Sequence, residues 1–130
     1  MTKIVHTTEP REISEIVDLI HDCWLDAEAI SFNSETSVVQ LRYFKEVKKP
    51  WSLINRIRFP AFECFLRISE VESLVVEDLQ KIRFYDMNEL KYDSKSMYVE
   101  LTTGVPIGIR AKVRNFDIAV EETDNVVQKT

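Results

Sequence analysis

The chain has 130 residues, of which 45% are hydrophobic and 30% are charged, and its formal net charge is −5. This composition is that of a globular protein with its own core, and the acidic balance argues against general binding to nucleic acids. With only two glycines, Gly104 and Gly108, the chain excludes a glycine-rich phosphate-binding loop.

The N-terminal segment lacks a signal-peptide pattern, and no apolar run of the sequence is long enough to span a bilayer. We therefore expect a cytoplasmic protein. The two cysteines, Cys23 and Cys64, both fall at positions that we expect to be buried, and they are interpreted as free thiols.

A helix is predicted over about residues 9–25, after a tail at residues 1–8 that we expect to be loose. Thr8 is a suitable N-cap, and Pro10 fits the first turn. Apolar side chains then recur at helical spacing, which is typical of an amphipathic helix with one buried stripe. The stripe consists of Ile13, Ile16, Val17, Ile20, Cys23, Trp24 and Ala27.

Two segments that lie 60 positions apart, residues 28–41 and 88–101, share one pattern of apolar and polar residues. Each copy reads as a strand, a polar turn and a second strand, so the chain is predicted to contain two similar hairpins. Matching same-face residues sets the register and leaves four-residue loops. The predicted pairs are Phe32 opposite Val39 around a loop at 34–37, and Tyr92 opposite Val99 around a loop at 94–97. Whether the repeat reflects duplication is left open.

Alternating strands are predicted over most of the chain after residue 60, whereas residues 45–60 are irregular. Residues 51–58 are compatible with either a short helix or a strand. Because nearly every strand is half polar, a parallel sheet covered on both faces is excluded. The last residues, 123–130, are polar and are expected to be frayed.

These elements predict an α+β fold, in which the N-terminal amphipathic helix packs on a curved antiparallel sheet of about six to eight strands. We expect one domain spanning residues 1–130, with loose ends at 1–8 and 123–130. The predicted core places Ile16, Ile20 and Trp24 against Phe62, Leu66, Ile109 and Phe116.

No catalytic, metal-binding or nucleotide-binding motif is found, so no catalytic residue, metal or cofactor is assigned. The run His21-Asp22-Cys23 contains a base and a nucleophile, but adjacent residues on a helix point apart. We interpret it as a core cysteine beside a boundary histidine. The acidic residues around His21 lack a second histidine at ligand spacing, so they indicate a solvated helix face.

Basic and aromatic residues are interleaved in residues 42–58, a pattern that suits phosphate groups of nucleic acids or anionic membranes. The alternative is a solvated segment whose cations pair with the acidic helix, and we favour it because the chain is acidic. The candidate anion-binding residues are Lys45, Lys48, Lys49, Arg56 and Arg58.

Four aromatic residues fall on the strand phase opposite to the core residues: Phe44, Phe65, Tyr85 and Tyr98. They are predicted to line the second face of the sheet as an interaction surface. A β-bulge would shift the phase and is the alternative explanation.

The first functional hypothesis is therefore a non-catalytic binding protein that acts through an exposed sheet face, by self-association or on another protein. The second is a small-molecule carrier or enzyme with a cavity between sheet and helix. The third is an anion-binding module that uses the basic and aromatic segment.

Overall fold

The computed structural model describes residues 2–46, 60–78 and 80–128. These residues form nine strands in one antiparallel sheet, with a 3-10 turn η1 (Pro10–Glu12) and a helix α1 (Ile13–Ile20). The strands are β1 (Lys3–Thr7), β2 (Trp24–Asn33), β3 (Val38–Glu46), β4 (Pro60–Ile68), β5 (Val71–Glu77), β6 (Phe84–Asp93), β7 (Tyr98–Thr103), β8 (Gly108–Val113) and β9 (Ile118–Gln128).

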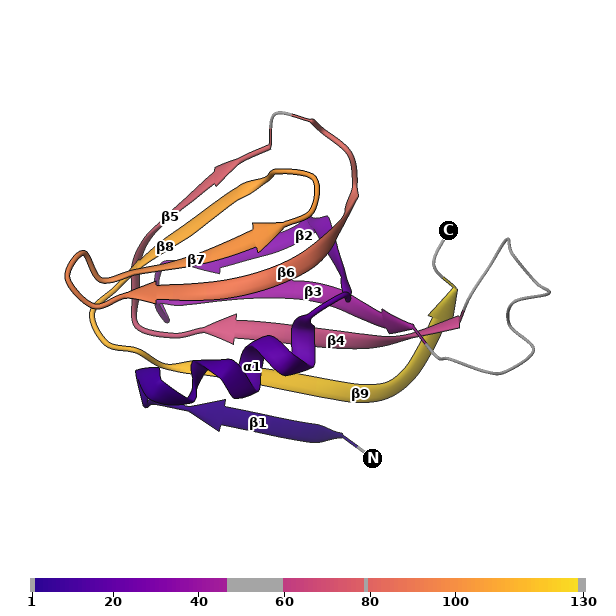
Figure 1. Ribbon diagram of the computed structural model, residues 1–130, viewed down its shortest axis with the longest axis horizontal. Helices are drawn as coiled ribbons and strands as arrows, with labels where there is room; N and C mark the ends of the chain where they lie inside the picture. Colours follow the sequence, from indigo (N-terminus) through magenta and orange to yellow (C-terminus); the bar gives the residue numbers. More distant parts are fainter. Residues whose placement is uncertain (1, 47–59, 79, 129–130) are drawn as a thin grey trace.

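The strands follow one another across the sheet in the order β1-β9-β4-β3-β2-β6-β7-β8-β5, so β1 and β5 are its two edges. Figure 1 shows the sheet curling, with α1 on its inner side against β6 and β9. The α+β architecture of one helix on an antiparallel sheet is confirmed in outline, although the described sheet has nine strands instead of six to eight.

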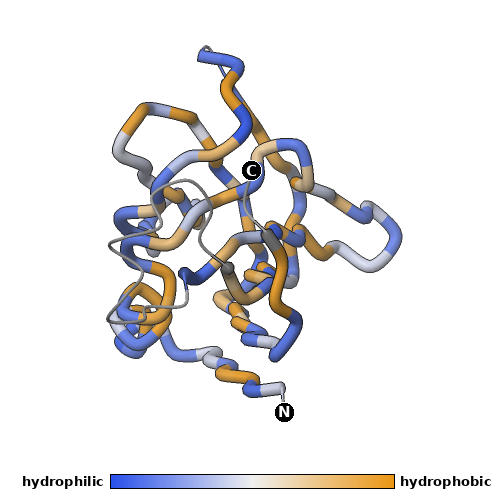
Figure 2. The backbone as a smooth tube through the Cα atoms, turned by 90° about the vertical axis from the view of Figure 1, so that its right-hand side faces the viewer, coloured by the Kyte–Doolittle hydropathy of each residue, from blue (hydrophilic) through white to orange (hydrophobic). Residues whose placement is uncertain are grey.

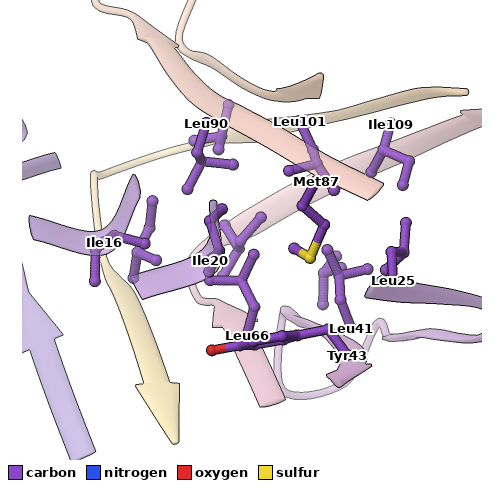
Figure 3. Close-up of a cluster of buried hydrophobic side chains, with 14 of the residues drawn as sticks. Ile16, Ile20, Leu25, Leu41, Tyr43, Leu66, Met87, Leu90, Leu101 and Ile109 are labelled. Carbon is purple, nitrogen blue, oxygen red and sulfur yellow. The ribbon is translucent and has the colours of Figure 1, made fainter. Parts of the chain in front are cut away.

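Hydrophobic and hydrophilic residues alternate along most strands (Figure 2), because successive side chains of a strand point to opposite faces. Inner side chains of β2, β3, β4, β6, β7 and β8 meet α1 in one hydrophobic core (Figure 3). The largest fully buried members include Tyr43, Tyr85, Ile16, Ile20, Leu25, Leu41, Leu66 and Met87. Of the predicted core, Ile16, Ile20, Leu66, Ile109 and Phe116 are confirmed, and Phe62 is partly buried against it.

The expectation of a helix through residue 25 was wrong. Helix α1 ends at Ile20, and Asp22 adopts a left-handed backbone conformation with φ 64°. The chain then enters β2, where Leu25 points into the core and Trp24 lies half-buried on the opposite face. The apolar run at 23–25 fits either a helix or a strand, and one residue in a left-handed conformation ends the helix.

The expectation of loose ends at 1–8 and 123–130 was also wrong for the described residues. Residues 3–7 form β1, which pairs with β9, and β9 itself continues to residue 128. Strand β1 lies at the edge of the sheet, where its main-chain hydrogen bonds to β9 hold it and Val5 packs against the core. The end of β9 is held by its pairing with the first residues of β4.

The two predicted hairpins are confirmed in register. Phe32 lies opposite Val39, and Tyr92 lies opposite Val99. In each loop the Asx side chain accepts hydrogen bonds from two backbone N–H groups: Asn33 from residues 35 and 36, and Asp93 from residues 95 and 96. Each loop also ends in a residue with φ 60°, Ser37 in one and Met97 in the other.

The similarity of the hairpins extends to the whole sheet, because the strands on the two sides of the β2–β6 boundary are arranged in the same way. We call β2, β3, β4 and β9 the first half, and β6, β7, β8 and β5 the second half. In the centre, Leu25 lies opposite Tyr85, with Trp24 opposite Asp86 and Asp26 opposite Phe84. The two triplets, residues 24–26 and 84–86, are again 60 positions apart.

The outer strand of each half follows, in the chain, a strand of the other half. β5 follows β4 but pairs with β8, and β9 follows β8 but pairs with β4. The two connections are joined where they cross: Ser69 N–H donates to the Asp117 carbonyl at 2.9 Å, and Arg114 N–H donates to the Glu70 carbonyl at 2.8 Å. The two halves therefore hold each other through exchanged strands and a shared core.

Candidate functional site

The side of the sheet that faces away from α1 and the core is called here the outer face. Among the described residues, four arginines on this face each lie over an aromatic ring, at 4.5 to 5.6 Å from the ring centre. The four arginine–aromatic pairs are Arg42 with Phe44, Arg67 with Phe65, Arg83 with Phe84, and Arg110 with Tyr98. This geometry combines cation–π attraction with cover of the apolar ring.

Each of these arginines also lies beside a carboxylate. The contacts are 2.7 Å from Arg42 to Glu63, 2.7 Å from Arg67 to Glu121, 3.1 Å from Arg83 to Asp26, and 3.6 Å from Arg110 to Glu100. An arginine fixed both by a ring and by a carboxylate has little rotational freedom left, so its remaining N–H donors point in defined directions.

Asp26 is the most buried charged residue among those described, with 1% of its surface exposed. Arg83 donates to both of its carboxylate oxygens, at 3.1 and 3.2 Å, and Arg42 approaches to 3.7 Å. The backbone N–H of Glu28 donates to Oδ1 at 3.1 Å. A carboxylate this deeply buried is stable only with hydrogen-bond and ion-pair partners. Asp26 therefore ties Arg42 of β3 and Arg83, which directly precedes β6, to one point of β2.

The four predicted surface aromatics are only partly where the strand phase placed them. Phe65 and Tyr98 lie half-buried on the outer face, and Phe44 is on that face but only 4% exposed. Tyr85 was predicted wrongly: it belongs to the core with 1% exposure, and its neighbour Phe84 takes the outer position.

The error at Tyr85 has a local cause. The pairing of β6 with β7 shifts between Met87 and Glu89, which marks a β-bulge. Tyr85 and Met87 point inward before the bulge, and Leu90 points inward after it.

The sequence pattern predicted Ile82 and Phe84 to face inward, but Ile82 is exposed and β6 runs without a turn from Phe84 to Asp93. A bulge adds one residue and inverts the alternation, so Tyr85 and Leu90 face the same side of the sheet.

The sequence did contain a signal for the arginine–aromatic pairs that the search for motifs missed. Residues two apart on a strand share a face, and both Arg42 with Phe44 and Phe65 with Arg67 have this spacing. Their carboxylate partners come from other strands, and the sequence carries no comparable signal for those.

Of the predicted anion-binding residues, Lys45 is half-exposed and its Nζ lies 3.2 Å from a Glu122 carboxylate oxygen. That contact is an ion pair with an acidic strand and not with the acidic helix. Lys48, Lys49, Arg56 and Arg58 lie outside the described residues, so the anion-binding surface stays a prediction.

A cavity of about 690 Å³ lies at the C-terminal end of α1, between the helix, the end of β3, the first part of β4 and the middle of β9. Its apolar lining comes from Leu19, Cys23, Phe62 and Cys64. Its polar lining comes from Lys3, Asp18, His21, Asp22, Lys45, Glu46, Glu122, Thr123 and Asp124. The position is the one that the second functional hypothesis requires, between sheet and helix.

The two cysteines of this cavity are free and buried. Burial raises the pKa of Cys23 to about 12 and that of Cys64 to about 11. Both thiols are therefore protonated at neutral pH, and only the thiolate is a strong nucleophile or metal ligand.

The neighbours of Cys23 do not form a catalytic dyad with it. His21 Nδ1 lies 3.0 Å from the carbonyl oxygen of Asn88, whereas the Cys23 thiol lies 3.5 Å from the carbonyl of Leu19. The interpretation of a core cysteine beside a boundary histidine agrees with these contacts.

Within the described ranges, no three His, Cys, Asp or Glu side chains are grouped closely enough to hold a metal ion. The helices among these residues are too short to cross a membrane. Comparison with protein-family models, curated proteins and solved structures finds no match to this chain.

Proposed function

We propose that the protein works by binding a folded protein partner through the outer face of the first half of its sheet. The observation that carries this proposal is the cluster of three arginine–aromatic pairs on β3, β4 and at the start of β6. Buried Asp26 joins Arg42 and Arg83, and Phe65 lies opposite Arg42 in the register of β3 and β4. The fourth pair, Arg110 with Tyr98, lies on β7 and β8 in the second half.

The composition of the cluster is that of an interface centre. Arginine and large aromatic residues supply most binding hot spots, because they combine a wide apolar contact with directed hydrogen bonds. Arg42 and Arg67 keep 30% and 36% of their side-chain surface exposed, so a partner can reach them. Phe65 lies half-buried beneath Arg67.

The order of these side chains before binding strengthens the proposal. Ordering a long side chain at an interface costs roughly 0.5–1.5 kcal/mol. Arg67 is already held by Gln40 at 2.8 Å and by Glu121 at 2.7 Å. Most of that cost is therefore met within the folded chain, and the surface is prepared for a partner that offers carboxylate or carbonyl oxygens beside a flat apolar group.

The second half offers a matched control for the test. The double variant Phe65→Ala with Arg67→Ala removes one arginine–aromatic pair of the cluster, and Tyr98→Ala with Arg110→Ala removes the same chemistry outside it. Tagged wild type and both variants would be purified from the native cells, and the bound proteins quantified. Thermal unfolding of each variant checks that it is folded.

We expect a partner that copurifies in a fixed ratio with wild type and with the Tyr98/Arg110 variant, and about tenfold or more weakly with the Phe65/Arg67 variant. Coexpression of two differently tagged copies reveals whether the partner is a second copy of the chain. Equal loss in both variants, or loss in neither, would contradict the proposal.

A further inference from the structure

The two edge strands of the sheet differ in how well they are protected against pairing with a further strand. Strand β1 is short, and its Lys3 points to the inner face, where it lines the cavity at the end of α1. An inward-pointing charge on a short edge strand hinders the addition of another strand. Strand β5 is longer and contains no lysine, arginine or proline. Its charged residues, Glu72 and Glu77, lie near its two ends, so the centre of this edge is unprotected.

The free side of β5 is a regular strand edge. Residues 73–77 pair one for one with residues 108–112 of β8, after a shift of register between Val71 and Ser73. Along such a strand about half of the backbone N–H and C=O groups point away from the neighbouring strand. In the described part of the chain, the backbone of residues 72–77 makes no hydrogen bond beyond its pairing with β8. Figure 1 shows β5 at the margin of the sheet, so this edge can accept a further strand.

Apolar side chains are exposed along the same edge. Val75 is 47% exposed on the outer face, and Val76 is 42% exposed on the inner face beside half-buried Leu74. Ile82 and Val105, in the loops after β5 and before β8, are exposed as well. A strand added to β5 would cover both valines, and this burial favours its addition.

The charges of this edge favour a basic strand. Glu72 and Glu77 are exposed, and neither forms an ion pair with any described residue. The nearest unpaired cation on β8 is Lys112, which lies opposite Ser73 and one strand away from the free edge. Lysine or arginine side chains of an added strand would therefore be attracted to both glutamates.

The same charges disfavour a second copy of β5. An antiparallel pairing centred on Val75 would bring Glu77 and Asp78 of one copy beside Glu72 of the other. Like charges that lie opposite each other on neighbouring strands are destabilising. The apolar centre of β5 matches itself, but its acidic ends do not.

From this edge we propose that β5 binds an extended segment of another protein, which adds to the sheet as a further strand and carries lysine or arginine near both of its ends. Main-chain hydrogen bonds hold the segment, and its apolar residues cover Leu74 and Val76 on one face and Val75 on the other. The site lies at the edge of the second half, two strands away from Tyr98 of β7. It is independent of the interface proposed above.

The first test compares three blocked peptides by isothermal titration calorimetry at low salt. The peptides are acetyl-KVTVTVK-amide, its counterpart with glutamate at both ends, and the lysine peptide with every residue between the lysines N-methylated. We expect the lysine peptide to bind at least about tenfold more tightly than the glutamate peptide. The N-methylated peptide should not bind, because it lacks the N–H donors for pairing. No binding of the lysine peptide at millimolar concentration, equal binding of the lysine and glutamate peptides, or binding of the N-methylated peptide would overturn the proposal.

Variants then locate the binding. Glu72→Lys with Glu77→Lys reverses the charge at both ends of β5. The matched control, Glu15→Lys with Glu35→Lys, makes the same change of net charge at two exposed carboxylates, one on α1 and one in the first hairpin loop. Thermal unfolding checks that both variants are folded. If the β5 variant is not, the milder Glu72→Gln with Glu77→Gln takes its place and should bind both peptides equally.

We expect the β5 lysine variant to bind the glutamate peptide about tenfold or more tightly than the lysine peptide, and the control to keep the preference of wild type. An unchanged preference in the β5 variant, or the same change in the control, would show that the peptides bind elsewhere and would overturn the assignment.

Light scattering after size exclusion tests the other occupant of the edge, a second copy of the chain. Val75→Lys places a charge at the centre of the β5 edge, which prevents pairing between copies. We expect wild type and this variant to have the same mass. A wild-type dimer that Val75→Lys dissociates would show that β5 pairs with a second copy, and would overturn the proposal.

Discussion

The two halves of the sheet have the same framework but carry different chemistry. Both contain a hairpin with the same register, an Asx residue before the loop and a left-handed residue at its end. Both receive their outer strand from the other half of the chain. The arginine–aromatic cluster and the cavity at the end of α1, in contrast, are built on the first half, with α1 and the start of β6.

The clearest difference lies at the centre, between Asp26 and Asp86. They occupy equivalent positions of the two triplets, yet Asp26 is 1% exposed and bound by two arginines. Asp86 is half-buried, and its carboxylate lies so close to Gly104 that a Cβ there would be 2.5 Å from Oδ1. The same backbone arrangement therefore holds an aspartate in each triplet. Only Asp26 has arginine side chains beside it among the described residues, so only Asp26 is the centre of an ion-pair network.

The largest expected effects test what the halves share. Leu41 and Leu101 are equivalent core residues, 0% and 2% exposed. We expect Leu41→Ala and Leu101→Ala each to lower the free energy of unfolding by about 2–5 kcal/mol, because both side chains belong to one core. Chemical denaturation should show a single transition for both variants. Separate transitions, or a large effect in only one variant, would mean that the halves are stabilised independently.

A smaller effect should separate the two central aspartates. Asp26→Ala leaves Arg83 and Arg42 without their buried partner, which we expect to cost about 2–3 kcal/mol, below the full value for a buried pair because both arginines are partly exposed. Asp86→Ala should cost less than about 1 kcal/mol. Urea unfolding measures both. Equal costs would show that the network around Asp26 adds nothing to stability.

The arginines over aromatic rings should contribute still less. Arg67→Ala and Arg110→Ala each remove one cation–π contact and one surface ion pair, and we expect each to lower stability by about 0.5–1 kcal/mol. Thermal unfolding checks this. A much larger loss for Arg67 alone would indicate that the cluster is structural, and would weaken its interpretation as a binding surface.

The smallest effect concerns acid stability of the hairpin loops. The backbone N–H groups of Lys95 and Ser96 lower the pKa of Asp93. Because the folded pKa is below the unfolded one, this stabilisation is present above the unfolded value of about 3.9. It is lost as the pH falls through the folded pKa.

Asn33 makes the same loop hydrogen bonds without a titrating group. Asp93→Asn should therefore keep the hairpin while removing this part of the acid dependence, as measured by unfolding at several pH values below about 5. An unchanged pH profile would show that the Asp93 carboxylate does not contribute.

The parts of the fold that sequence predicted are local ones. Hairpin register follows from a few neighbouring residues such as Phe32 and Val39, and the stripe of α1 follows from helical spacing at Ile16 and Ile20. The error at Trp24 arises because the left-handed backbone of Asp22 ends the helix. The error at Tyr85 arises because a β-bulge after Met87 changes which side chains of β6 face the core. Alternation alone does not locate such residues.

The exchange of outer strands was not predictable from these patterns, because it depends on pairings between segments far apart in the chain. The same holds for the cavity, whose lining combines Lys3, Leu19, Phe62 and Glu122. The aromatic residues of the outer face could in part be predicted from strand phase. The carboxylates beside the arginines, such as Glu121 beside Arg67, could not be predicted, because they come from other strands.

Photo-crosslinking in living cells would show whether the outer face of the first half binds a protein. A photoreactive phenylalanine analogue would replace Phe65 in one variant and Tyr98 in another, since both rings lie half-buried on the outer face under an arginine. We expect a discrete covalent adduct with one protein from position 65 and none from position 98. An adduct from position 98 of equal yield, or none from position 65, would contradict the proposed interface.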